Sequence, residues 1–96
     1  MGKPVIRVGT DKSKGHGCFP PTQPVSSSTN VKANGIKVVR MGDRYSPHRC
    51  GKVVHGSRIA QSSSSVKVNG RSVHRMGDGI SCGDSAGRGS PNVRAG

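Results

Sequence analysis

The chain has 96 residues, of which 29% are apolar, and its aromatic side chains are one Phe and one Tyr. A chain of this length and composition buries one small core at most, so we expect a single domain over residues 1–96. The net charge is +12, because 16 Lys and Arg stand against four acids. Such a balance suits nucleic acid, but the chain offers almost no stacking platform, so no specific nucleic acid is expected.

Helical structure is disfavoured along the whole chain. Gly and Ser interrupt nearly every stretch of ten residues, and Leu and Glu are absent, so no apolar stripe with helical spacing can be drawn. Short β-strands and turns remain, which predicts an all-β fold. Residues 1–7 have no apolar run of signal-peptide length, and no stretch is apolar enough to cross a membrane. We therefore expect the protein to be made in the cytoplasm.

In chain order, the first predicted element is a strand with a closing turn at residues 4–11. A strand and turn of similar sequence also end a longer unit at residues 28–43. This unit recurs at residues 63–78, with 10 of 16 positions identical and no gap. Chance would give about one identity over that length. The last element, residues 90–96, matches the strand that opens the unit. The two end fragments therefore predict a third, permuted copy.

Each unit is predicted to be a β-hairpin. Asn34-Gly35 and Asn69-Gly70 are the favoured pair for a type I′ turn, in which both central residues have positive φ. The strand positions expected to face inward are Val31, Ala33, Val66 and Val68, with Lys32 and Lys67 facing outward. Val38 and Val39 are adjacent and break the alternation, which predicts a bend or bulge there.

The acids have a structural explanation in this arrangement. Gly42-Asp43 and Gly77-Asp78 are expected to end the two complete hairpins, with each Asp accepting backbone N–H groups. The remaining acids, Asp11 and Asp84, do not make a hydrolytic pair, so we expect no enzyme; a hydrolytic toxin using Asp84 is the alternative of that class. The runs of Ser at residues 26–28 and 62–65 precede the units at the same phase, which favours edge or inter-unit turns over flexible linkers.

The cysteines and histidines are the candidate metal ligands. Cys18, Cys50 and Cys82 are an odd number beside four His, which favours metal ligation in a reducing compartment over a disulfide framework. Cys18 also fits a small buried residue. A small basic zinc-binding module for nucleic acid or protein, built on Cys50 and Cys82, is the alternative function, although no Cys-x-x-Cys knuckle supports it.

The repeats and their flanking motifs resemble the PAAR-repeat family over essentially the whole chain, from Val5 to Gly96. The matching motifs are Gly15-His16-Gly17, Val66-Lys67-Val68-Asn69-Gly70, Arg75-Met76-Gly77-Asp78 and Ser81-Cys82-Gly83. Two positions depart from the pattern. The first turn has Gly9-Thr10 in place of Gly-Asp, which leaves its capping open, and Ala33 replaces a strand valine.

The resemblance implies a short cone of three pseudo-repeats, stapled near its tip by one structural Zn²⁺. Its broad base would sit on a trimeric β-helical spike, in a type VI secretion system or a contractile phage tail, and its role would be mechanical piercing of the target cell envelope. Three hairpins in one chain suit one copy per trimer. This would be a bare tip without an effector extension, so any effector cargo would bind separately.

In the family the zinc ligands are three histidines and one cysteine. His16 and Cys82 match the early histidine and the Ser-Cys-Gly cysteine, His48 and His55 match the intermediate pair, and Cys50 is the substitute ligand. All four chosen residues follow Gly-Asp-type turns, which the repeat would bring together at one end of the cone. His74 aligns with Val39 inside a repeat strand and is therefore not expected to be a ligand.

Overall fold

The computed structural model describes residues 2–96, and its regular elements are all short antiparallel strands, as the all-β prediction requires. The strands are β1 (Lys3–Pro4), β2 (Lys32–Ala33), β3 (Ile36–Lys37), β4 (Arg44–Cys50), β5 (Val53–Arg58), β6 (Lys67–Val68), β7 (Arg71–Ser72) and β8 (Arg94–Ala95). They pair as β1 with β8, β2 with β3, β4 with β5, and β6 with β7. Within residues 2–96 there is no helix with the length and apolar character needed to cross a membrane.

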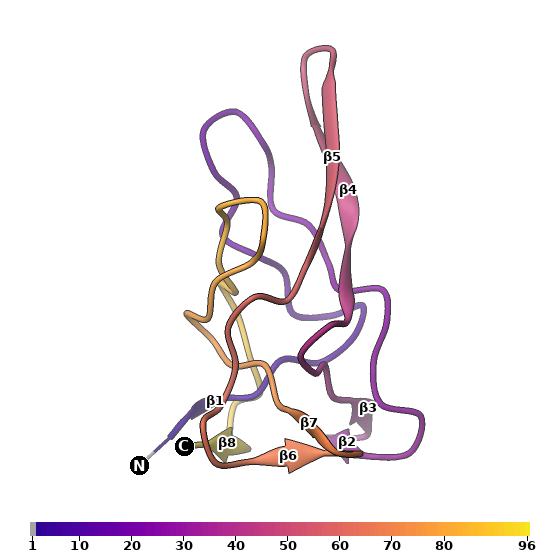
Figure 1. Ribbon diagram of the computed structural model, residues 1–96, viewed down its shortest axis with the longest axis vertical. Helices are drawn as coiled ribbons and strands as arrows, with labels where there is room; N and C mark the ends of the chain where they lie inside the picture. Colours follow the sequence, from indigo (N-terminus) through magenta and orange to yellow (C-terminus); the bar gives the residue numbers. More distant parts are fainter. Residues whose placement is uncertain (1) are drawn as a thin grey trace.

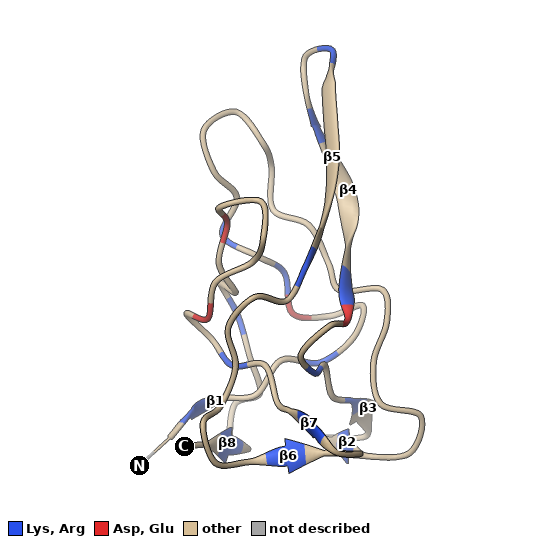
Figure 2. Cartoon of the chain, in the orientation of Figure 1, with Lys and Arg blue, Asp and Glu red and all other residues tan. Residues whose placement is uncertain are grey.

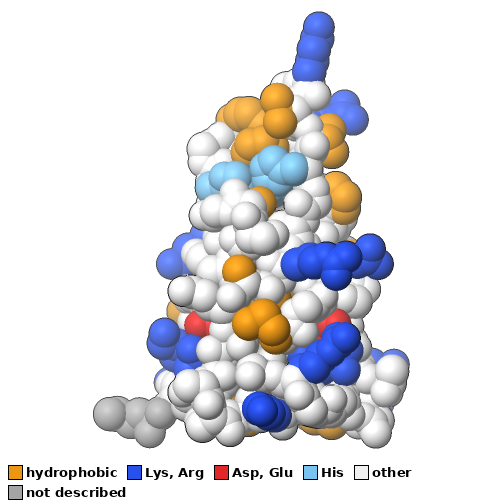
Figure 3. Space-filling model, viewed as in Figure 1, with side chains coloured by type: hydrophobic (Ala, Val, Ile, Leu, Met, Phe, Trp, Pro, Cys, Tyr) orange, Lys and Arg blue, Asp and Glu red, His pale blue; other side chains and the backbone are white. Residues whose placement is uncertain are grey.

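The molecule tapers from a broad end to a narrow apex. Three of the strand pairs, β1–β8, β2–β3 and β6–β7, lie together at the broad end, whereas the longer β4–β5 hairpin rises along the long axis to the apex (Figure 1). The principal extents are 38, 25 and 20 Å. The space-filling view shows the same taper, with histidine side chains near the narrow end (Figure 3).

The two Asn-Gly hairpins form as predicted. Asn34 and Gly35 have φ of 55° and 79°, and Asn69 and Gly70 have φ of 54° and 77°. Ala33 pairs with Ile36 in the first hairpin, which leaves two residues in the turn, the arrangement of a type I′ turn.

The permuted third copy is also present. Lys3 pairs with Ala95 and Pro4 with Arg94, in the register that Ala33–Ile36 and Lys32–Lys37 have in the first complete unit. The third hairpin is therefore assembled from the two ends of the described chain, which meet at the broad end.

The three units are closed into a ring by backbone hydrogen bonds. The amide of Ile6 donates to the carbonyl of His74, His74 donates to Val39, and Val39 donates back to Ile6, at 2.9–3.1 Å. These three residues hold equivalent positions in the units and are all fully buried. The irregularity expected at Val38 and Val39 is thus a change of partner: β3 ends at Lys37, and the chain then pairs with the neighbouring units.

One Arg–Asp pair closes each unit. The carboxylates of Asp43 and Asp78 accept hydrogen bonds from the backbone amides and guanidinium groups of Arg40 and Arg75, as the turn prediction requires. In the permuted unit Asp11 does the same for Arg7, one residue later in the chain because of Thr10. This closes the turn whose capping the sequence left open. The hydrogen bonds with these aspartates raise the pKa of both Arg7 and Arg75.

Three buried serines begin the units, which confirms the inter-unit turns. The hydroxyl oxygens of Ser28, Ser63 and Ser90 each accept hydrogen bonds from the second and third following backbone amides. Ser28 also donates to Asn69 and Ser90 to Asn34, so each of these serines is bonded to the turn of another unit.

The core has two layers along the axis. A lower cluster at the hairpins contains Val5, Ala33, Val38, Val73 and Ala95, and an upper cluster contains Ile6, Val39, Tyr45, Ile59, Ile80 and Ala86. The prediction that Val31 and Val66 face inward is wrong: they are 36% and 38% exposed. The strands begin only at the following lysines, so the inward alternation is limited to Ala33 and Val68.

Candidate metal centre

Four side chains from three segments converge near the apex. His48 on β4 and His55 on β5 are directly paired across the hairpin. His16 comes from the loop of residues 12–24, and Cys82 from the loop of residues 79–87. The structure thus brings together all four residues that the sequence selected.

Local hydrogen bonds fix the two loops that carry His16 and Cys82. His16 and Phe19 exchange two backbone hydrogen bonds across a tight turn, and the amide of Gly83 donates to the carbonyl of Ile80 beside Cys82. The buried carboxylate of Asp84 accepts hydrogen bonds from the amides of Gly15 and Ser85 at 3.2 and 2.7 Å. Asp84 therefore links the loop that carries His16 to the loop that carries Cys82.

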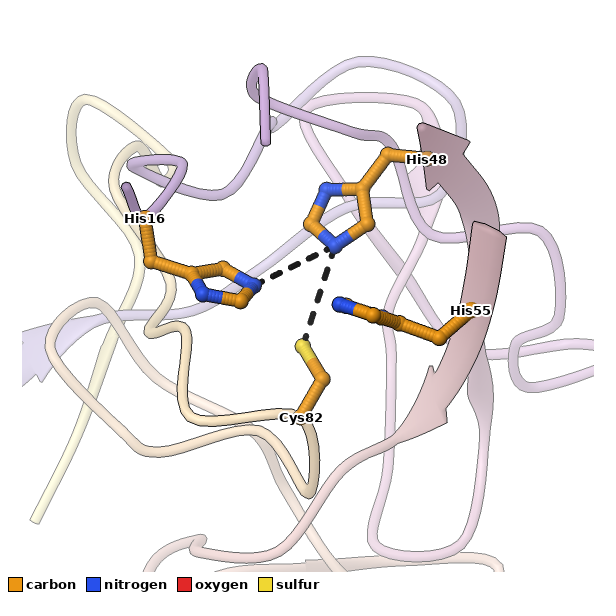
Figure 4. Close-up of side chains that lie close together, drawn as sticks. All are labelled: His16, His48, His55 and Cys82. Atoms are coloured by element: carbon orange, nitrogen blue, oxygen red, sulfur yellow. Dashed lines mark hydrogen bonds between the residues drawn. The ribbon is translucent and has the colours of Figure 1, made fainter. Parts of the chain in front are cut away.

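The donor atoms lie at the separations that a tetrahedral metal centre needs. His16 Nε2 and His48 Nε2 are 3.3 Å apart, Cys82 Sγ is 4.0 Å from His48 Nε2, and one donor atom from each of the four residues lies within 4.8 Å of the others. Metal–nitrogen bonds of about 2.0–2.1 Å place two tetrahedral nitrogens about 3.4 Å apart. Figure 4 shows the four side chains pointing toward one centre. The residues present therefore fit a metal ion.

The environment of His48 favours the ligand form of its ring. Its Nδ1 lies 2.8 Å from the carbonyl oxygen of Pro20, so Nδ1 carries the proton and donates to that oxygen. The other nitrogen, Nε2, is then left with a free lone pair facing the cluster, as in metal-bound histidines. No such bond orients His55, whose buried Nδ1 has no hydrogen-bond partner among residues 2–96.

Phe19 is a component of the centre that the sequence analysis did not identify. Its ring packs against those of His55, His48 and His16, with centroid separations of 4.1, 4.8 and 4.8 Å. An apolar cover of this kind limits water access to the ligands. The signal available in the sequence was that Phe19, the one Phe of the chain, lies three residues after a predicted ligand.

The other two cysteines are bonded to each other, which the sequence did not predict. Cys18 and Cys50 form a disulfide, with Cα atoms 5.3 Å apart, so the expectation of metal ligation without a disulfide is wrong for this pair. The pairing removes Cys50 as a substitute ligand and removes the zinc module built on Cys50 and Cys82. Cys18 is exposed and not a small buried residue. Its loop reaches the end of β4, a proximity that sequence spacing does not reveal.

His74 lies apart from the cluster, in the core. Its Nδ1 donates to the carbonyl of Gln61 at 2.9 Å, so its Nε2 accepts from the Tyr45 hydroxyl at 3.1 Å. Burial lowers the pKa of His74, and burial together with nearby carboxylates raises the pKa of Tyr45. Both groups are therefore neutral at pH 7.

Comparison with known proteins identifies the family. A family model described as the PAAR motif matches residues 14–87. A search of curated proteins finds no match. The family match covers more than half of the chain and includes the two complete repeats and all four residues of the cluster. The chain therefore belongs to the PAAR-motif family, whose members are structural, metal-binding spike-tip modules of type VI secretion and phage-type machines.

Proposed function

We propose that this protein caps the blunt end of a trimeric β-helical spike and sharpens it for piercing a target envelope. The observation that carries the proposal is the pseudo-threefold ring of hairpins at the broad end. One chain presents three equivalent strand pairs there, joined by equivalent hydrogen bonds. A single copy can then match each of three identical spike subunits without leaving two unmatched surfaces.

The apex has a different role in this proposal. His16, His48, His55 and Cys82 hold one structural Zn²⁺, which ties the β4–β5 hairpin to the two neighbouring loops. Three imidazoles and one thiolate make a closed tetrahedral set, which leaves no position for a catalytic water. The Cys18–Cys50 disulfide adds a second connection between the loop of residues 12–24 and the hairpin. The protein is thus a mechanical part and does not turn over a substrate.

The setting follows from the same role. The chain is made in the cytoplasm, assembled at the end of a secretion or phage-tail spike, and delivered into the target envelope when the sheath contracts. Residues 2–96 act as one domain in this role, and an effector protein is a further candidate partner.

Native mass spectrometry of the chain mixed with the spike protein of the same machine tests the stoichiometry. We expect one copy per spike trimer, because the three hairpins already supply the threefold surface. Three copies per trimer, or no complex, would contradict the proposal.

A further inference from the structure

The broad end carries exposed valines that recur in all three units and are not part of the buried core. Val31, Val66 and Val93 hold equivalent positions in the three units and are 36%, 38% and 38% exposed. Their backbone carbonyls each accept one hydrogen bond from a buried valine amide, a role that any residue type would fill. The side chain is nevertheless valine in all three copies, although the two complete copies differ at 6 of their 16 positions.

A cation follows each of these valines. Lys32, Lys67 and Arg94 are equivalent, exposed, and lie on β2, β6 and β8 around the broad end (Figure 2). The three cations and the three valines together are called the base ring below. Because Ala33, Val68 and Ala95 turn inward beside these cations, the cations are held on the outer side of the strands.

The chain provides no negative side chain to neutralise this ring. All four aspartates are buried, at 0–4% exposure, and three of them are paired with Arg7, Arg40 and Arg75. The charged side chains at the surface of the described residues are therefore all Lys and Arg. Three equivalent cations beside three equivalent apolar side chains complement an anionic partner with the same symmetry.

We infer that the base ring docks on a threefold protein end that carries Asp or Glu side chains beside small apolar side chains. The inference rests on the proposed function, because the spike trimer is the threefold partner, and it adds the chemistry that the spike end must have. Each spike subunit places one acidic side chain against one of Lys32, Lys67 and Arg94. The valines exclude water from these contacts, which strengthens them.

The test measures binding of the spike trimer at about 0.05 M and about 0.5 M NaCl, where the screening length falls from about 14 Å to about 4 Å. We expect the dissociation constant of the wild type to rise about tenfold or more between these salt concentrations. The triple variant Lys32→Glu, Lys67→Glu, Arg94→Glu should bind at least about a hundredfold more weakly at low salt. The milder variant with Gln at the same positions should lose most of the salt dependence.

A matched triple variant, Lys12→Glu, Arg49→Glu, Lys52→Glu, has the same net charge but alters exposed cations outside the base ring. It should bind like the wild type. Bound metal and the thermal unfolding midpoint, measured for every variant, identify any that fails to fold. A complex with one copy per trimer that is insensitive to salt and to the base-ring variants would overturn this inference and leave the proposed function standing. Absence of any complex with folded wild type would overturn both.

Discussion

At the scale of single residues, the structure separates four histidines of one small chain into two environments. His16, His48 and His55 face one another and Cys82, whereas His74 is enclosed in the core between Tyr45 and Gln61. The first three histidines are placed to bind one metal ion together with Cys82. His74 is placed where its ring stays neutral. Each environment makes its own prediction.

Replacing a ligand should remove the metal. Cys82→Ser and His48→Ala should each reduce bound zinc from about one per chain to a small fraction, because a structural zinc site needs all four donors. His74→Val is the matched control, since it removes a histidine outside the cluster, and it should keep its zinc. Metal analysis of the purified proteins measures this directly, and a folded wild type that binds no zinc would rule out the site.

The linkage between the two ligand loops gives a related prediction. Asp84→Ala should weaken zinc binding about tenfold or more, because it removes the carboxylate that holds the amides of Gly15 and Ser85. Competition with a chelator of known affinity measures the change. Equal affinity in wild type and variant would show that Asp84 does not position the ligands.

The buried His74 predicts a pH dependence of stability. Its pKa is below the unfolded value of about 6.5, so the unfolded chain binds more protons, and stability falls as the pH drops below about 6.5 toward the folded pKa. Chemical denaturation of the wild type and of the Tyr45→Phe, His74→Val double variant isolates this effect, since the zinc ligands are common to both. The stability advantage of the wild type should shrink on acidification. A constant difference would contradict a neutral, buried His74.

At the scale of elements, the turns set the register of the broad end. Gly35 and Gly70 have φ near 78° and no atom within 4 Å of an added Cβ, so a substitution there is opposed by backbone strain and not by a clash. Gly35→Val and Gly70→Val should each cost about 1–3 kcal/mol of unfolding free energy. Thermal unfolding should show similar losses at both sites. A difference between them beyond about 1 kcal/mol would mean that the hairpins are not equivalent.

The Cys18–Cys50 disulfide joins a loop to the end of β4, and the sequence does not reveal that these two segments lie close together. It closes a loop of 32 residues' separation, for which chain entropy predicts a stabilisation of about 3–4 kcal/mol. Cys18→Ser with Cys50→Ser should lose this amount while still binding zinc, because Cys82 is separate from the pair. Thiol labelling after metal removal should detect one free cysteine in the oxidised wild type. Three free cysteines under oxidising conditions would contradict the disulfide.

Across the whole molecule, the sequence predicts most features of the repeated units and few features of the non-repeated loops. The Asn-Gly turns, the Gly-Asp turns and the permuted third unit follow from identities within the chain, so each copy supports the others. The convergence of His16 with Cys82 also follows from the repeat. The cover formed by Phe19 and the pairing of Cys18 with Cys50 depend on how loops of unique sequence fold back, and no internal copy reports on them. The exposure of Val31 and Val66 was not predicted because both strands begin one residue later, at the following lysine.

The ring of hydrogen bonds that joins Ile6, Val39 and His74 bears on how the molecule carries force. In the proposed role, a thrust along the long axis would press the broad end of the cone against its support and tend to splay the three units apart. The ring encircles the axis, so splaying has to stretch its three backbone bonds together, as the hoop of a barrel is stretched by outward pressure. One Arg–Asp pair also closes each of the three units. In that role the cone would resist bursting at the level of the upper core cluster, directly above the hairpins that would receive the load.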